Sequence, residues 1–268
     1  MTVVEGSGVV VTGGGAGIGR ALARRLAAGG GRVVVNDLDA AAAAAVAEEI
    51  GGYAVPGDVA TEEGVRELIA GARGHLGEID IFCSNAGIAE GTGPDAPETS
   101  WQRSWELNVM AHVRASRELL PGWLGRGQGC FVVTASAAGL LTMLGAAPYS
   151  VTKHGAEAYA EWLAATYGHR GLAVHCICPQ GVRTQMLAGS GRAGEIVLAA
   201  AAIEPEQVAE ALAAAMAVGK FLVLPHPEVR DYYVHRATDT DRWLRGMSRL
   251  QQRIDDANEA NDATGETS

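Results

Sequence analysis

Tyr149 and Lys153, four residues apart, are the first pair of side chains in this sequence that could do chemistry together. Four residues make about one turn of an α-helix, so both side chains project from the same face. A phenol normally holds its proton until about pH 10, but a nearby ammonium favours the phenolate and lowers the pKa. The pair could therefore act as a general acid and base near neutral pH, although Tyr-x-x-x-Lys also occurs by chance on solvated helix faces.

Ser136 adds a third polar group to this pair. It follows the apolar run 131–133, which indicates a strand, and it precedes Tyr149 in the chain. Its hydroxyl could hydrogen-bond the substrate oxygen that Tyr149 protonates. The segment between them carries no charge, and four of its side chains could line an apolar pocket, a buried loop or a subunit contact: Leu140, Leu141, Met143 and Leu144.

Apolar, β-branched stretches alternate with helical ones along most of the chain, which predicts a parallel sheet with helices on both faces. The expected strands are 9–12, 32–36, 54–58, 79–83, 129–134, 172–178 and 220–224. The expected helices are 20–28, 40–50, 61–76, 100–123, 149–168 and 205–218. Pro121 should help to stop the fourth of these helices. We therefore predict an α/β fold: a doubly wound (Rossmann-like), mostly parallel seven-stranded sheet in a single domain.

Ligands of open parallel sheets bind beyond the carboxyl ends of the strands, and a glycine-rich loop follows the first strand here. Glycines in residues 13–19 would let the backbone approach a pyrophosphate and turn into a helix whose amino end attracts anions. The loop does not satisfy strict Gly-x-Gly-x-x-Gly and lacks the Gly-Lys-Ser/Thr of a P-loop. A flexible turn is the alternative.

Asp37 follows the second strand, roughly 20 residues beyond the glycine loop, where a carboxylate commonly meets the adenosine ribose. This position favours NAD, because the 2′-phosphate of NADP would meet a like charge. Ala16, rather than Arg or Lys, precedes Gly17, so the loop offers no cation for that phosphate. The alternative is an acidic residue at the start of the next helix.

Five elements recur in order: Thr12-Gly-x-x-x-Gly-x-Gly, Asp58, Asn85-Ala-Gly, Ser136 and Tyr149-x-x-x-Lys. Over residues 9–224 the sequence resembles the short-chain dehydrogenase/reductase family, in its compact, single-domain, NAD-dependent branch. Each motif alone is weak evidence for this family, but the five motifs in this order are a specific sign of it.

The resemblance implies roles for individual residues. Tyr149 would give or take the proton, Lys153 would lower its pKa and hold the nicotinamide ribose, and Ser136 would orient the substrate oxygen. Asn108 would carry a water that links to Lys153, or would simply cap a helix irregularity. The implied cofactor contacts are Gly13, Gly17, Ile18, Gly19, Asp37, Leu38, Asp58, Val59, Asn85, Ala86, Gly87, Tyr149, Lys153, Pro179, Val182 and Thr184.

The roles of the remaining cofactor contacts also follow from the resemblance. Asp58 would receive the adenine amine, Asn85 would brace the sheet, and Val182 and Thr184 would meet the nicotinamide amide. The sequence departs from the family in three places, at Ser84, at Gln180 and in a tail beyond Leu224 that is longer than the core pattern needs. Ser84 replaces a frequent asparagine, which we expect to matter little.

Gln180 is the second departure, because the family often has glycine there. Its side chain could project toward nicotinamide or substrate, and with Leu144 it is a tentative substrate residue. Residues 185–204 are expected to form a lid. With the apolar segment before Tyr149, this favours a secondary alcohol or ketone that is apolar or alicyclic.

The predicted function is thus an NAD-dependent oxidoreductase that interconverts a secondary alcohol and a ketone. The alternative is a regulator that binds NAD without turnover, whose mark would be loss of Tyr149 or Lys153. A methyltransferase would also use a glycine loop and a ribose-binding acid, but it has no need of the Ser136, Tyr149 and Lys153 set.

Composition narrows the class of protein. Hydrophobic residues make up 48% and charged residues 19% of the 268 residues, so a large core can form. A net charge of −10 argues against a nucleic-acid partner.

No apolar run reaches the roughly 20 residues of a membrane span, and residues 1–8 lack signal-peptide features. Four cysteines form no disulfide pattern, and Cys176 and Cys178 should pack on one side of a strand rather than bind metal. We expect a reducing, cytoplasmic location.

The chain shows no composition break, so residues 1–225 are expected to form one NAD-binding catalytic domain. Residues 226–257 should form a helical extension, because Trp243, Met247, Leu250 and Ile254 repeat at helical spacing. This extension would contact a second subunit or cover the substrate entrance. Residues 258–268 are polar and expected to be disordered. The family commonly forms dimers or tetramers, which implies a homodimer or homotetramer here.

Overall fold

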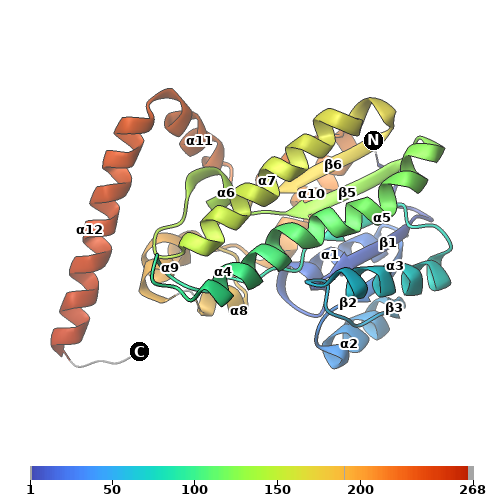
Figure 1. Cartoon of the computed structure of the whole chain (residues 1–268), viewed down its shortest axis with the longest axis horizontal. Coiled ribbons are helices and arrows are strands. Elements are labelled where there is room, and N and C mark those ends of the chain that lie inside the picture. Colours follow the sequence, from blue (N-terminus) through green and yellow to red (C-terminus); the bar gives the residue numbers. More distant parts are fainter. Residues whose placement is uncertain (1, 190, 265–268) are drawn as a thin grey trace.

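The protein is built on one sheet of seven parallel strands, in the order β3-β2-β1-β4-β5-β6-β7 (Figure 1). The computed structural model describes residues 2–189 and 191–264. The strands are β1 (Gly8–Thr12), β2 (Arg32–Asn36), β3 (Tyr53–Ala54), β4 (Ile81–Ser84), β5 (Gly129–Thr134), β6 (Leu172–Ile177) and β7 (Leu222–Val223). The predicted doubly wound α/β fold is confirmed. Because the strand order reverses between β1 and β4, their carboxyl ends flank the point where such sheets bind ligands.

Twelve α-helices and several shorter turns connect the described strands. The helices are α1 (Gly17–Ala28), α2 (Ala40–Ile50), α3 (Glu62–Leu76), α4 (Glu98–Trp105), α5 (Ala111–Arg126), α6 (Ala138–Leu141), α7 (Ala147–Tyr167), α8 (Gln185–Ala188), α9 (Gly191–Leu198), α10 (Pro205–Val218), α11 (Glu228–Thr238) and α12 (Thr240–Thr264). None of the helices in the described part of the chain is both long and apolar enough to cross a lipid bilayer.

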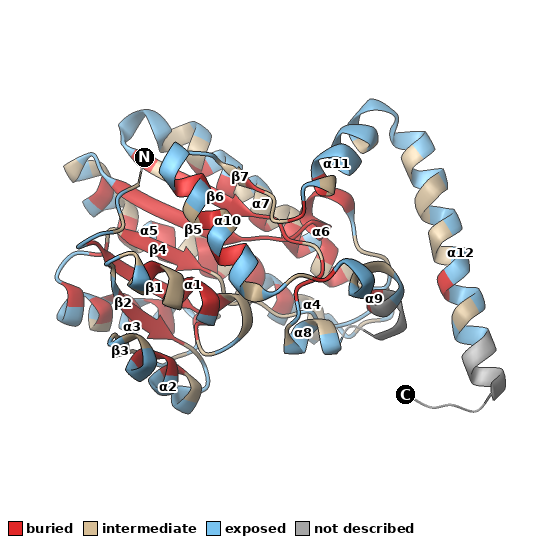
Figure 2. Cartoon of the chain, turned by 180° about the vertical axis from the view of Figure 1, so that it is seen from behind, coloured by how far each residue is buried: buried red, intermediate tan, exposed pale blue. Residues whose placement is uncertain are grey.

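The sheet is buried on both faces, which explains why its strands read as unbroken apolar runs. Val10 of β1 faces a core that includes side chains of α3, α5 and α7. Val9 and Val11 face the opposite core, which includes side chains of α1, α2 and α10. Figure 2 shows the buried residues concentrated in the sheet and on the sides of the helices that cover it.

The helix predicted over residues 100–123 is wrong in two respects. It is divided by a π-helical turn, Glu106–Met110, which separates α4 from α5. It also continues past Pro121 to Arg126 and ends at Gly127, whose φ of 67° is left-handed. Pro121 is exposed, whereas Trp123 is buried and donates its indole N–H to the Ile79 carbonyl at 2.7 Å. We infer that this packing overrides the proline, which alone is a poor helix former.

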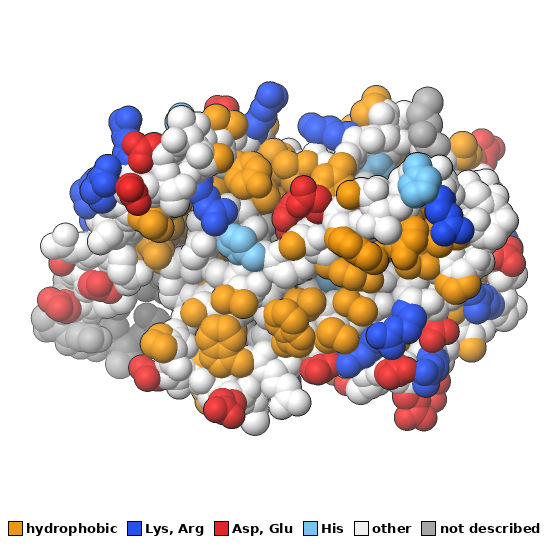
Figure 3. All heavy atoms as spheres, turned by 45° about the horizontal axis from the view of Figure 1, so that its top comes forward, with side chains coloured by type: hydrophobic (Ala, Val, Ile, Leu, Met, Phe, Trp, Pro, Cys, Tyr) orange, Lys and Arg blue, Asp and Glu red, His pale blue; other side chains and the backbone are white. Residues whose placement is uncertain are grey.

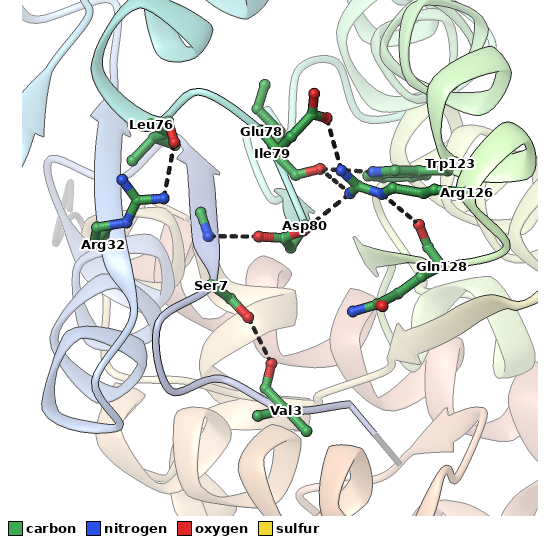
Figure 4. A network of polar contacts seen from close by, with 11 residues as sticks. Val3, Ser7, Arg32, Leu76, Glu78, Ile79, Asp80, Trp123, Arg126 and Gln128 are labelled. Carbon is green, nitrogen blue, oxygen red and sulfur yellow. Dashed lines mark hydrogen bonds and ion pairs between the residues drawn. The ribbon is translucent and has the colours of Figure 1, made fainter.

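A polar network fixes the amino ends of the strands, at the edge of the sheet opposite the ligand site (Figure 4). The Asp80 carboxylate accepts hydrogen bonds from the Gly8 amide at 2.8 Å and from Arg126 at 3.0 Å. Arg126 also pairs with Glu78 at 2.6 Å. The end of α5 is thereby tied to the start of β1, while the carboxyl ends of the strands stay free for ligand binding.

The C-terminal extension consists of α11 and α12, and α12 stands away from the body of the protein (Figures 1 and 2). It contacts α9 and α11. The expected disorder from residue 258 is wrong for residues 258–264, because α12 continues to Thr264. These residues include no glycine or proline that would end a helix, and Gly265 follows them. Residues 265–268 lie outside the described residues.

Candidate active site

A cleft of about 2310 Å³ runs along the carboxyl ends of the strands. Every site residue predicted from the sequence lines it, with the exception of Asn108. Pockets for drug-sized ligands usually measure about 300–1,000 Å³, so this cleft is large enough for a dinucleotide and a second molecule. Residues that are far apart in the sequence thus meet in one space.

The glycine loop enters helix α1 through Ala16, which has extended backbone angles and no side chain bonded across the first helical turn. The amide groups at the start of α1 therefore remain available to an anion. Gly17 has a φ of 50°, which L side chains rarely adopt, and a Cβ atom at Gly19 would lie 1.9 Å from the Gly13 carbonyl oxygen. The loop can take this close conformation only with glycine at these two positions.

Asp37 joins the end of β2 to the glycine loop. Its carboxylate accepts hydrogen bonds from the Gly15 amide at 2.9 Å and from the Asp39 amide at 3.1 Å. The alternative role, capping α2, belongs to Asp39, whose carboxylate accepts from the Ala41 and Ala42 amides in the first turn of the helix. Asp37 is half-buried on the cleft, and its neighbour Leu38 is 76% exposed.

Asn85 and Thr12 hold the carboxyl ends of β4 and β1 together. The Asn85 side-chain amide donates to the Thr12 carbonyl at 3.0 Å. In return, the Thr12 hydroxyl accepts from the backbone amides of Asn85 at 2.9 Å and Ala86 at 3.0 Å. These bonds make Asn85 a brace at the strand-order reversal, the role that the family resemblance implies.

Tyr149 and Lys153 lie one turn apart on α7, and both line the cleft. Lys153 is 3% exposed, and its Nζ atom donates to the Thr134 carbonyl at 2.8 Å. The same Nζ lies 5.6 Å from the centroid of the Tyr149 ring. Burial lowers the pKa of Lys153 to about 8, because the low-dielectric surroundings disfavour its charged form.

The expected lowering of the Tyr149 pKa is not found. Burial of the phenol raises its pKa, and hydrogen bonding with Ser136 only opposes that effect. The nearby Cys178 thiol adds to the increase. In the protein alone, the two residues therefore share a site without the acidified phenol that their spacing suggested.

Ser136 follows β5 and is buried at 8% exposure. Its hydroxyl accepts a hydrogen bond from the Ala138 amide at 3.1 Å and donates to the Pro179 carbonyl at 3.4 Å. Ser136 is thus fixed between the end of β5 and the segment 179–184 that follows β6, and it remains on the cleft wall.

Asn108 lies behind the cleft, in the π-helical turn between α4 and α5. Its side chain exchanges hydrogen bonds with both backbone groups of Ile88, each at 2.9 Å, and donates to the Thr152 hydroxyl at 3.0 Å. A Cβ atom at Gly87 would lie 3.0 Å from its Oδ1 and 3.2 Å from Nζ of Lys153. Asn108 is therefore a close neighbour of Lys153, while the implied water remains a prediction. π-Helical turns often occur at functional sites.

Ser84 makes a buried contact that the sequence did not indicate. Its hydroxyl lies 2.6 Å from Nδ1 of His112, and both residues are buried. Burial, with the nearby charge of Lys153, lowers the pKa of His112 to about 3. Ser84 therefore lies against a neutral histidine, close to Lys153.

Three of the four apolar residues before Tyr149 line the cleft: Leu141, Met143 and Leu144. Leu140 does not, because its side chain is 1% exposed and belongs to the core that includes side chains of α5 and α7. The predicted lid residues that also line the cleft are Gln185, Met186, Leu187, Ala188, Gly189, Val197, Leu198, Ala199 and Glu204.

Gln180 lines the cleft without a left-handed backbone, since Thr142 is the one non-glycine residue with positive φ among those described. Its amide donates to Nδ1 of His226 at 3.1 Å. The sequence analysis did not single out His226. It left open whether Trp243 and Met247 contact a second subunit or cover the substrate entrance, and both line the cleft. The signals available were a histidine between two prolines after the last strand and the apolar spacing of the tail.

The residues described contain no group of three or more His, Cys, Asp or Glu side chains that could hold a metal ion. The sulfurs of Cys176 and Cys178 are buried, 3.8 Å apart, on one side of β6 and its extension. Hydrogen bonding with the Cys178 thiol, together with burial, raises the pKa of Cys176, so it packs as an apolar group.

Comparison with known proteins agrees with this geometry. The sequence profile of short chain dehydrogenases matches residues 7–194. The 1-deoxy-11-beta-hydroxypentalenate dehydrogenase of Streptomyces avermitilis is 34% identical over 195 residues, 69% of this chain and 72% of the relative. The 2,5-dichloro-2,5-cyclohexadiene-1,4-diol dehydrogenase of Sphingobium indicum is 36% identical over 193 residues, 70% of this chain and 77% of the relative.

A solved structure extends the comparison to the whole fold. A short chain dehydrogenase/reductase from Burkholderia phymatum, in complex with NAD, superposes with a TM-score of 0.82 at 26% identity, covering 90% of this chain and 96% of that one. The profile match, the relatives and this superposition lead to one conclusion: the chain belongs to the short-chain dehydrogenase family, as its sequence motifs suggested.

Proposed function

We propose that this protein is an NAD(H)-dependent oxidoreductase that interconverts a secondary alcohol and a ketone. One observation carries the proposal: Ser136, Tyr149 and Lys153 line the same cleft as the glycine loop and Asp37. An acid/base group, a group that orients an oxygen and a dinucleotide cradle are together what hydride transfer between an alcohol and a cofactor requires.

Several features of the cleft fit NAD. The start of α1 leaves its amides for a pyrophosphate. The carboxylate of Asp37, which is bonded to the glycine loop, is the group that we propose to accept hydrogen bonds from the two ribose hydroxyls. Leu38 and Ala16 supply no cation for a 2′-phosphate. That the superposed Burkholderia phymatum protein is in complex with NAD supports the same cofactor here.

The residues of the chain provide the proton chemistry. When bound, the nicotinamide would accept hydride from the alcohol carbon or return it to the ketone. Tyr149 takes the hydroxyl proton in one direction and gives it back in the other, while Ser136 donates to the substrate oxygen. Lys153 favours the tyrosinate by its charge, and with a pKa of about 8 it is mostly charged at neutral pH.

The substrate side of the cleft favours an apolar or alicyclic molecule. Leu141, Met143 and Leu144 form one wall, and Trp243 and Met247 of α12 add further apolar surface. The relatives named above act on a hydroxypentalenate, a ring compound that carries a carboxylate, and on a cyclohexadienediol. Both support a ring substrate here, and the diol also supports one without an acid group. Gln180 is the polar residue that we propose to contact the substrate beside Leu144.

Absorbance of reduced nicotinamide tests this proposal, followed with NAD and a panel of secondary alcohols. We expect faster turnover of alicyclic apolar alcohols than of hydroxy acids, and more turnover with NAD than with NADP. Preference for hydroxy acids would contradict the substrate assignment. Tight NADH binding with no turnover of any alcohol or ketone would favour the alternative, a regulator that binds NAD without catalysis.

We also propose that the protein forms homodimers or homotetramers through the outer face of α4 and α7. Large apolar side chains are exposed there: Trp105 at 44%, Val151 at 49% and Trp162 at 50%. Apolar side chains gather in groups on the face of the molecule that Figure 3 draws. Light scattering after gel filtration should show an oligomer that Trp162→Glu disrupts; a wild-type monomer would contradict the proposal.

A further inference from the structure

His226 is a buried side chain, 3% exposed, in the short connection between β7 and α11. Both of its ring nitrogens contact backbone groups. Nδ1 lies 3.1 Å from the amide nitrogen of Gln180, and Nε2 lies 3.3 Å from the carbonyl oxygen of Ala201. One imidazole therefore bridges two segments more than 20 residues apart in the sequence.

The two partners fix the protonation state of this ring. A backbone amide can only donate, so Nδ1 must accept and carries no proton. A carbonyl can only accept, so Nε2 must carry the proton and donate. His226 is therefore a neutral imidazole in its Nε2–H form, since neither the other neutral form nor the imidazolium could make both bonds.

The first partner belongs to the segment 179–184, which lines the cleft beside the catalytic serine. The Pro179 carbonyl accepts from the Ala137 amide at 2.8 Å and from the Ser136 hydroxyl at 3.4 Å. Gln180 follows directly, and its amide is the group bound to His226. A shift of this segment would therefore change the position of the Ser136 hydroxyl, which is bonded to it.

The second partner, the Ala201 carbonyl, lies near the end of the predicted lid. Ala201 ends the short helical turn Ala199–Ala201 after α9, and the chain then returns to the segment where the lid begins. There the Ile203 amide donates to the Gly181 carbonyl at 3.1 Å, and the Arg183 amide donates to the Ile203 carbonyl at 2.9 Å. The start and end of residues 185–202 are thus held side by side, with His226 bonded across them.

We propose that His226 is a positioning residue that holds the end of the lid in register with the segment 179–184, so that the lid and the nicotinamide side of the cleft keep one arrangement. This inference rests on the proposed function for its catalytic meaning. A close contact supports it: a Cβ atom at Gly181 would lie 2.5 Å from the carbonyl oxygen of Leu198 in the lid. The two segments therefore have little room to slide independently.

Two substitutions at His226 test its hydrogen bonds to Gln180 and Ala201 separately. In His226→Asn the side-chain oxygen can take the place of Nδ1 and accept from Gln180, but the side chain is too short to reach Ala201. In His226→Gln the side-chain amide can take the place of Nε2 and donate to Ala201, but it leaves the Gln180 amide unpaired. His235→Asn, on the exposed surface of α11, is the matched control.

The test measures amide exchange in the lid without cofactor, together with the dissociation constant of NADH by fluorescence. Loss of one hydrogen bond should produce an effect of up to about tenfold. We expect His226→Asn to speed exchange in residues 185–202 about tenfold and to leave NADH binding nearly unchanged. We expect His226→Gln to weaken NADH binding by a similar factor and to keep the lid protected.

Equal changes in the two variants, or none beyond those of His235→Asn, would overturn the inference. If the variants do not fold, wild-type exchange decides: the Gln180 and Ile203 amides should open together, and a protected Gln180 beside a freely exchanging Ile203 overturns it. Failure of the wild type to bind NADH would instead count against the proposed function, while lid exchange would still test the role of His226.

Discussion

Lys153 lies over the ring of Tyr149: Nζ is 5.6 Å from the ring centroid and is hydrogen-bonded to the Thr134 carbonyl at 2.8 Å. The lysine can therefore influence the phenol through its charge, without a direct bond. Because burial lowers the pKa of Lys153 to about 8, that charge is itself lost in mildly alkaline solution. The acid/base pair thus depends on a cation that is costly to bury.

This cost predicts a pH-dependent stability. The folded pKa of Lys153, about 8, lies below the ordinary value of 10.5, so between these pH values the unfolded chain binds more protons and stability rises with pH. Relative to Lys153→Met, the wild type should gain up to about 3 kcal/mol in free energy of unfolding between pH 7 and 10.5. Urea unfolding of both proteins at several pH values measures this gain.

Other groups that titrate in that range, such as Tyr149 and the buried cysteines, are present in both proteins and largely cancel in the comparison. A difference in stability between wild type and Lys153→Met that stays constant from pH 7 to 10.5 would show that Lys153 is not buried as a destabilised cation.

Tyr149→Phe removes one hydroxyl and little else, because the ring keeps its place on α7. NADH binding should stay within about twofold of wild type, while turnover of the best alcohol should fall by about 100-fold to 10,000-fold, the usual contribution of a general acid/base. Fluorescence titration and steady-state kinetics give the two numbers. Turnover close to wild type would exclude Tyr149 as the proton-transfer group.

Gly87→Ala tests whether the space beside Lys153 matters. The new Cβ atom would lie 3.2 Å from Nζ of Lys153 and 3.0 Å from Oδ1 of Asn108, so one of these groups must move. We expect a loss of about 1–3 kcal/mol in stability and at least a tenfold fall in kcat. Gly74→Ala is the control, since its Cβ meets open space on α3 and should stabilise the helix by about 0.5–1 kcal/mol. Unchanged kcat in Gly87→Ala would show that the space beside Lys153 and Asn108 does not limit turnover.

The sheet and the cleft were predictable because their signals are local. Unbroken apolar runs mark strands buried on both faces, and the polar residues that follow them, such as Asp37 and Ser136, must meet at one edge of a parallel sheet. The resemblance to a family then assigned roles that strand patterns could not. Asn108 is an example: its position behind Lys153 depends on a π-helical turn, and no sequence pattern predicted that turn.

What could not be predicted depends on contacts between distant segments. The direction of the Tyr149 pKa shift is set by burial of the phenol, which spacing along a helix does not report. The partner of Ser84, His112, lies on another element, and the bond from Gln180 to His226 joins residues on either side of α10. Helix α5 passes Pro121 because of tertiary packing, and local propensity alone predicted its end.

Asp37 and Leu38 should decide between NAD and NADP. Replacing both, Asp37→Ser with Leu38→Arg, removes the like charge and adds a cation for the 2′-phosphate. We expect kcat/KM for NADP to rise at least tenfold and that for NAD to fall by a similar factor. Asp39→Ser, which keeps a capping side chain on α2, should leave the preference unchanged. No change of preference in the double variant would remove Asp37 from the cofactor site.

Trp243 offers the sharpest test of the C-terminal extension. Its ring lines the cleft from α12, a helix that otherwise contacts only α9 and α11 among the larger contacts of the described chain. Trp243→Ala removes apolar surface from the substrate side, so KM for an alicyclic alcohol should rise about tenfold or more while NADH binding stays unchanged. Leu244→Ala, at an exposed leucine next to Trp243 on the same helix, controls for loss of apolar surface outside the cleft. Should KM stay constant in Trp243→Ala while the oligomeric state changes, the extension would serve subunit contact and leave substrate binding to the catalytic domain.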